Sequence, residues 1–128
     1  MKRILLLDDN IDACQSTVHV LEQNYDVVKC RDVITAKRRI SIDRFDLMII
    51  DLMMPTKGLS NSDEFSAGIN FYDEFVKDVY TCPVLFWTNL SDTSFKAYKD
   101  KNQGAKIHYH HKGDNSGALL NAIHEILK

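Results

Sequence analysis

Several features that mark other protein classes are scarce in this 128-residue chain. Its three cysteines are an odd number without metal-ligand spacing, which predicts reduced thiols in a cytoplasmic protein. Sixteen basic residues stand against 18 acidic ones, so no overall field favours nucleic acid or a membrane surface. The first apolar run, residues 4–7, meets Asp8 at once and is far too short for a signal peptide or a membrane span. We therefore expect a soluble protein that binds neither nucleic acid nor membrane directly.

What the chain does contain is an alternation of short apolar runs with helical patterns. The runs are long enough for strands buried on both faces of a parallel sheet, and they lie at residues 4–7, 26–30, 47–50, 84–87 and 107–110. Apolar residues recur at helical spacing between them, for example from Tyr72 to Val79, but only sparsely around Phe95 and Tyr98. This alternation predicts an α/β fold, a single doubly wound flavodoxin-like domain over residues 1–128 with parallel strand order 2-1-3-4-5.

Polar side chains follow four of the five runs. Asp8 and Asp9 follow the first run and Asp51 the third, while Thr88 follows the fourth and Lys112 comes just after the fifth. In an open parallel sheet the ligand crevice lies beyond the carboxyl ends of the strands, where the strand order reverses. That point lies between the first and third strands, so we expect these five side chains to converge there.

Three carboxylates in one place repel one another and need a cation. Hard oxygen ligands with room for water suit Mg²⁺, which would also orient an incoming phosphoryl group for attack by Asp51. The Thr88 hydroxyl and the Lys112 ammonium could each meet a phosphoryl oxygen. Taken singly, the acids could be turn residues and Lys112 a solvated lysine. Their joint placement favours a phosphorylation site.

Four stretches of the sequence resemble the receiver domains of two-component response regulators. They are ILLLDDN at residues 4–10, DLMIIDLMMP at 46–55, VLFWTN at 84–89 and GAKIHYHHK at 104–112. The resemblance covers essentially the whole chain and implies that a histidine kinase or phosphotransfer protein phosphorylates Asp51. It also implies that Asp9 and Asp51 bind Mg²⁺ directly, Asp8 mainly through water, and the Met53 backbone carbonyl as a further ligand.

The resemblance also implies how the phosphoryl group acts. Thr88 would move toward it, and Tyr109 would be an aromatic rotamer switch, with simple edge-strand packing as the plainer interpretation. The output surface would comprise the fourth helix, fifth strand and fifth helix, which would bind a downstream protein partner or a second copy of the chain. The protein would then be a signalling module and not a stand-alone enzyme.

Two departures from the receiver pattern affect the site. Gly113 follows Lys112 where the family usually has proline, so we expect the lysine to be held less firmly. Twelve residues, 56–67, separate Pro55 from Gly68, where the family has only a few. This polar segment could cover the site, contact a partner or be an ordinary solvated loop.

Met53 and Leu90 are apolar at positions flanking the acceptor and the hydroxyl. Neither can orient an attacking water, so we predict a long-lived phosphoryl group. The histidines of the fifth run suggest a metal site only weakly, since alternation puts His108 and His110 on one face with Tyr109 opposite and no third ligand is visible.

Two other functions compete with this interpretation. A receiver-like interaction module that works without phosphorylation would tolerate both departures. A hydrolase or nucleotide-binding enzyme on a doubly wound sheet is disfavoured, because the turn from Asp8 to Asp12 has no glycine to cradle a phosphate.

Overall fold

A five-stranded parallel sheet organises the chain, of which the computed structural model describes residues 1–102, 104 and 106–128. The strands are β1 (Arg3–Leu7), β2 (Asp26–Cys30), β3 (Leu47–Ile50), β4 (Val84–Thr88) and β5 (Ile107–His111). Their order is β2-β1-β3-β4-β5 and every pairing is parallel, so the predicted flavodoxin-like topology is confirmed. Residue 105, inside the stretch 104–112 that carries part of the resemblance, lies outside the described residues.

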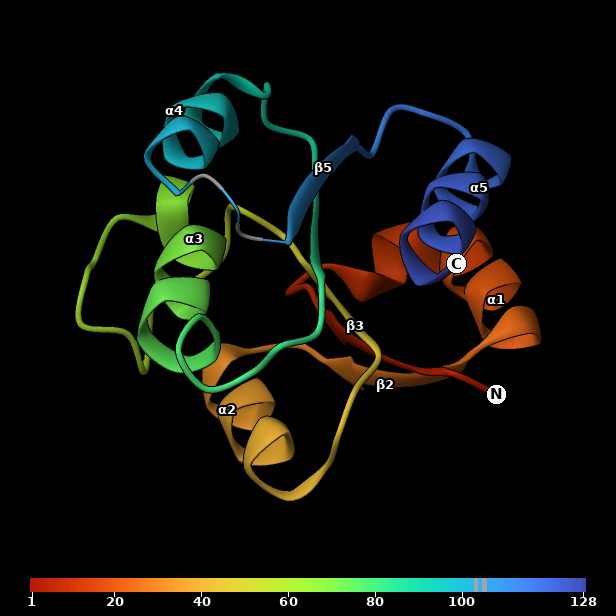
Figure 1. Ribbon diagram of the computed structural model, residues 1–128, viewed down its shortest axis with the longest axis horizontal. Coiled ribbons are helices and arrows are strands. Elements are labelled where there is room, and N and C mark those ends of the chain that lie inside the picture. Colours follow the sequence, from red (N-terminus) through yellow and green to blue (C-terminus); the bar gives the residue numbers. More distant parts are fainter. Residues whose placement is uncertain (103, 105) are drawn as a thin grey trace.

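Helices cover both faces of the sheet. They are α1 (Gln15–Asn24), α2 (Val33–Ile42), α3 (Ala67–Phe71), α4 (Thr93–Lys101) and α5 (Ser116–Leu127), with short helical turns η1 (Ile11–Cys14), η2 (Glu64–Ser66) and η3 (Tyr72–Val76). Figure 1 shows α1 and α5 on one side of the sheet and α2, α3 and α4 on the other. The helices therefore cover both faces of the sheet, as expected for a doubly wound fold.

Alternate residues of each strand enter two separate cores. In β1, Leu5 and Leu7 join the core beneath α2, α3 and α4, whereas Ile4 and Leu6 join the core beneath α1 and α5. All four of these side chains are fully buried. Burial on both faces explains why the strands are continuous apolar runs and not polar–apolar alternations.

Side-chain caps fix where two of the helices begin. The Asp32 carboxylate accepts a hydrogen bond from the Thr35 backbone N–H at the start of α2, and Asn115 caps α5 in the same way. Each cap satisfies a backbone donor that the first helical turn leaves free. Helix α4 is anchored more weakly, because Phe95 is the one buried apolar side chain among those described in it.

The predicted third helix is irregular. It is built from η2, five residues of α3 and a π-helical turn, in which the Lys77 N–H donates to the Tyr72 carbonyl five residues back. A π-turn takes more residues per turn than an α-helix, so it shifts the following side chains off the apolar face. The prediction that Val79 lies on that face is therefore wrong: Val79 follows the helix and is 73% exposed.

The segment 56–67 folds back on its neighbours. Gly58 has a φ of +98°, and a Cβ at this position would lie 3.0 Å from the Ile34 side chain. The Ser60 N–H donates to the Glu74 carboxylate, which joins the segment to η3. Since the Met54 N–H also donates to the Glu64 carbonyl, the two ends of the segment are held together. It is a hydrogen-bonded surface loop lying against α2 and η3.

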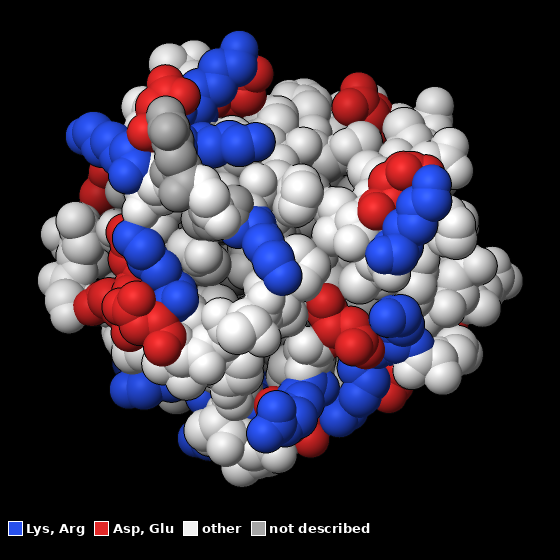
Figure 2. All heavy atoms as spheres, in the orientation of Figure 1, with Lys and Arg blue, Asp and Glu red and all other residues white. Residues whose placement is uncertain are grey.

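The surface carries charges of both signs. Lys and Arg side chains are interspersed with Asp and Glu over the face shown in Figure 2. Among the residues described, no helix is both long and apolar enough to cross a bilayer.

Candidate functional site

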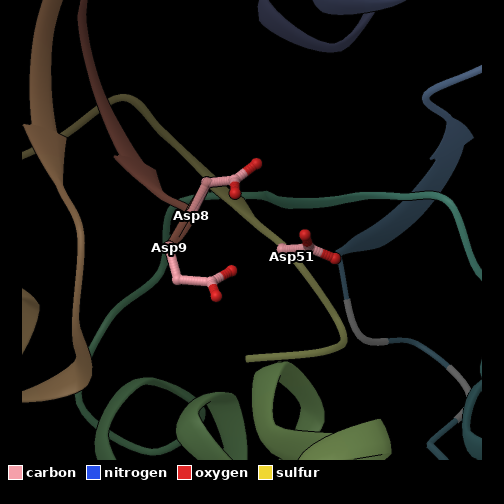
Figure 3. Close-up of side chains that lie close together, drawn as sticks. All are labelled: Asp8, Asp9 and Asp51. Atoms are coloured by element: carbon pink, nitrogen blue, oxygen red, sulfur yellow. The ribbon is translucent and has the colours of Figure 1, made fainter. Parts of the chain in front are cut away.

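Three carboxylates gather at the carboxyl ends of β1 and β3. Asp8 and Asp9 directly follow β1, and Asp51 directly follows β3 (Figure 3). One oxygen from each lies within 4.8 Å of the other two. The backbone holds this arrangement, because the Asp51 N–H donates to the Leu7 carbonyl at 3.0 Å. The predicted convergence of the three acids is confirmed.

Asp8 is the most deeply buried of the three acids. Its side chain is fully buried, and burial raises its pKa, although the nearby Lys112 ammonium and a hydrogen bond from the Asn10 N–H oppose the shift. Within the described part of the chain, its buried Oδ2 meets only the Lys112 ammonium, as an ion pair without hydrogen-bond alignment. That oxygen keeps the capacity to accept from a further ligand or water.

Lys112 joins two of the acids. Its Nζ lies 2.6 Å from Asp8 Oδ2 and donates a 2.8 Å hydrogen bond to Asp51 Oδ2. Burial alone would lower the pKa of Lys112, but its hydrogen bond to Asp51 and its charge interactions with Asp51 and Asp8 together outweigh burial and raise that pKa. The ammonium therefore stays charged and offsets part of the negative charge of the site.

The backbone around Lys112 is also ordered. The Lys112 N–H donates to the Thr88 carbonyl at 2.8 Å, which extends the β4–β5 pairing by one residue. The Gly113 N–H, which a proline would lack, donates to the His111 ring at 2.8 Å. A Cβ at Gly113 would lie 2.7 Å from the same ring nitrogen. A hydrogen bond thus orders the turn that follows Lys112, and the expectation that glycine holds the lysine less firmly than proline stays a prediction.

Thr88 and Tyr109 meet at the loop after β4. Thr88 is buried at the end of the strand, and its hydroxyl accepts a hydrogen bond from the Leu90 N–H. The Tyr109 hydroxyl donates to the Leu90 carbonyl, and its ring lies 5.6 Å from the Phe95 ring. Tyr109 is thus half-buried and turned toward α4. Its role as a switch stays a prediction.

The loop after Asp51 is fixed by one close contact that sequence reasoning did not identify. The Gly68 N–H donates to the Leu52 carbonyl at 2.9 Å, and a Cβ at Gly68 would lie 2.1 Å from the Asp51 carbonyl oxygen. Only glycine allows this approach, so the start of α3 sets the position of the acceptor. Met53 lies in the same loop, 44% exposed, and its N–H donates to Asp51 Oδ1.

The three acids are a suitable donor set for Mg²⁺. They offer hard carboxylate oxygens within 4.8 Å of one another, and a small oxygen-ligand set that leaves room for water suits Mg²⁺. Asp9 is exposed and can adjust, whereas Asp8 and Asp51 are fixed by burial. No second cluster of His, Cys, Asp or Glu capable of holding a metal occurs among the described residues.

The fifth-strand histidines are part of the sheet edge. His108 and His110 pair with Leu85 and Trp87 of β4, and Tyr109 packs on the opposite core, as alternation predicts. Burial lowers the pKa of His108, and His110 lies 3.6 Å from Asp114. These contacts are those of a half-buried edge strand.

No protein-family model and no curated protein matches this sequence. Solved structures do match it. The receiver domain of the Francisella response regulator 1452 is 23% identical, with a TM-score of 0.77, over 99% of this chain and 97% of that chain. A CheY-like response regulator receiver domain protein from Methanospirillum hungatei JF-1 is 24% identical, with a TM-score of 0.78, over 99% and 94%. A two-component response regulator from Clostridium difficile is 21% identical, with a TM-score of 0.76, over 99% and 96%. The chain therefore has the fold of response-regulator receiver domains.

Proposed function

We propose that this chain is a receiver module of two-component signalling that accepts a phosphoryl group on Asp51 in a Mg²⁺-dependent reaction. The observation that carries the proposal is the buried Lys112 ammonium, bound to both Asp51 and Asp8 and coming from a different strand end. A buried lysine paired with two carboxylates adds little to the stability of the fold, because the cost of removing the charges from water offsets their attraction. It is useful where a further anionic group must be received beside an aspartate.

The chemistry follows from the groups present. An oxygen of Asp51 forms a bond to phosphorus while the bond from phosphorus to the donor's imidazole nitrogen breaks, and the electron pair of that bond stays with the imidazole. Lys112 then pairs with a phosphoryl oxygen, and the Thr88 hydroxyl donates to another. Mg²⁺, when bound by Asp8, Asp9 and Asp51 with the Met53 carbonyl, would neutralise charge and align the phosphoryl group.

The output is a change of partner binding and not a separate catalytic activity. The new charge favours a different position of Thr88 and of the loop that Leu90 shares with Tyr109, and α4 moves because few apolar contacts hold it. The surface of α4, β5 and α5 would then bind a downstream protein or a second copy of the chain in the cytoplasm. A histidine kinase or a phosphotransfer protein would supply the phosphoryl group.

Intact-mass measurement tests the proposal. Purified protein is incubated with Mg²⁺ and acetyl phosphate or phosphoramidate, with the Asp51→Asn variant and a metal-chelated sample in parallel. We expect one added phosphoryl group in the wild type only. A wild type that gains none, while folded and supplied with Mg²⁺, would favour the phosphorylation-independent interaction module.

A further inference from the structure

The only tryptophan of the chain lies beside the lysine of the proposed site. Trp87 belongs to β4 and is 3% exposed, within the core beneath α1 and α5. Lys112 Nζ lies over its ring, 5.2 Å from the ring centroid. An ammonium within about 6 Å of an aromatic face is attracted by the negative charge of that face, and the indole ring attracts it best.

Burial makes this contact stronger than a surface pair. The Lys112 side chain is 8% exposed, so water screens the attraction between ammonium and ring only weakly. The Asp8 and Asp51 carboxylates contact the ammonium directly, and the indole ring, which belongs to the core, adds a third contact. The ring contact therefore restricts an ammonium that carboxylates alone would hold from one side.

Strand geometry explains how the two side chains meet. Trp87 pairs with His110 across the β4–β5 boundary, and Lys112 is two residues beyond His110, on the same face by alternation. The backbone of Lys112 is held by its hydrogen bond to Thr88. Four side-chain torsions between that backbone and Nζ remain free to rotate. Contact with the Trp87 ring restricts them.

We propose that Trp87 is a positioning residue for Lys112, holding the ammonium where it can meet an oxygen of the incoming phosphoryl group. This role rests on the proposed phosphorylation of Asp51. Trp87 itself contacts neither the phosphodonor nor the acceptor. Reducing the negative charge on the face of the indole ring should slow phosphoryl transfer. The phosphodonor concentration that gives the half-maximal rate should stay nearly unchanged.

Because Trp87 is the only tryptophan, fluorotryptophan can be placed at this one position with almost no change of shape. One, two and three ring fluorines progressively withdraw charge from the face. With acetyl phosphate and Mg²⁺, we expect the saturated phosphorylation rate to fall stepwise, by about tenfold across the series. A flat series, with the fold intact by circular dichroism, would overturn the proposal.

Substitution provides a second arm. Trp87→Phe keeps an aromatic face and should phosphorylate faster than Trp87→Leu, which keeps only apolar volume. Phe86→Leu is the matched control, since Phe86 is a buried ring of the same strand on the opposite core. It should lose stability without the same loss of rate. Equal rates for Trp87→Phe and Trp87→Leu would contradict a role for the ring face.

Nuclear magnetic resonance separates this inference from the proposed function. In the wild type, ring currents should shift the Lys112 ε-methylene protons upfield, and Trp87→Leu should abolish the shift. Ordinary chemical shifts in the wild type would refute the contact itself. If the upfield shift is present but Asp51 accepts no phosphoryl group, phosphorylation is the part that fails, and with it the positioning role.

Discussion

Replacing Gly68 with alanine should damage both stability and the proposed reaction. The new Cβ would lie 2.1 Å from the Asp51 carbonyl oxygen, against about 3.4 Å for an ordinary contact. The obstacle is backbone, so α3 or the acceptor loop must move, and the 2.9 Å hydrogen bond from Gly68 to Leu52 is lost or lengthened. Strain of about 1–3 kcal/mol and a lost hydrogen bond of about 1 kcal/mol give a destabilisation of roughly 2–4 kcal/mol. For a chain of this size that corresponds to a fall in Tm of roughly 8–16 °C.

Urea and thermal unfolding followed by circular dichroism measure this loss. Gly117→Ala is the matched control, because Gly117 holds the same second position in α5 and a Cβ there meets only the Asn115 side chain, at 3.2 Å. That control should change the free energy of unfolding by no more than about 1 kcal/mol. Displacing Asp51 should also slow phosphorylation of Gly68→Ala, by up to about 100-fold. If Gly68→Ala unfolds within about 1 kcal/mol of the wild type, the packing of α3 on the acceptor strand is not as tight as this reasoning requires.

Three further predictions concern the site. Burial raises the pKa of Asp8, so the folded state binds its proton more tightly than the unfolded state, and that stabilisation is lost as pH rises through the raised pKa. Asp8→Asn should therefore increase the free energy of unfolding at neutral pH, but not at a pH below the ordinary aspartate pKa. It should also weaken Mg²⁺ binding. Urea unfolding that shows the same effect of the substitution at both pH values would contradict this. Tyr109→Phe, which loses the bond to the Leu90 carbonyl, should cost about 1 kcal/mol and speed amide exchange in α4, and unchanged exchange would count against that link. The phosphoryl group on Asp51 should outlast seconds at neutral pH, since neither Met53 nor Leu90 can orient an attacking water. Met53→Asn should shorten its life, and mass spectrometry after donor removal measures the decay.

Sequence patterns predicted the sheet and the acidic site because both depend on local order. A strand buried on both faces must be a continuous apolar run, and a polar residue ending such a run must lie at the carboxyl edge of the sheet. These two rules place Asp51 and Lys112 beside each other although 61 positions separate them along the chain. Alternation along β5 likewise predicts the face on which Tyr109 lies.

The features that the sequence did not predict depend on contacts that local patterns do not encode. The π-turn at η3 depends on packing against neighbouring elements, and it is why Val79 was misplaced. The hydrogen bond between Gly113 and His111 is likewise a property of one turn, which the sequence alone does not reveal. Trp87 could have been identified, because alternation puts it on the same face as Lys112, but only once the β4–β5 register is known.

The segment 56–67 forms a loop that is closed by backbone hydrogen bonds near both of its ends. Two backbone hydrogen bonds, Met54 to Glu64 and Gly68 to Leu52, tie the end of the segment to the residues that follow Asp51. Insertions between these hydrogen-bonded residues should not displace Asp51. Doubling the length of a flexible loop costs only about 0.6 kcal/mol. The exposed residues between Ser60 and Asp63 are thus a place to insert a fluorescent reporter or an affinity tag without displacing Asp51.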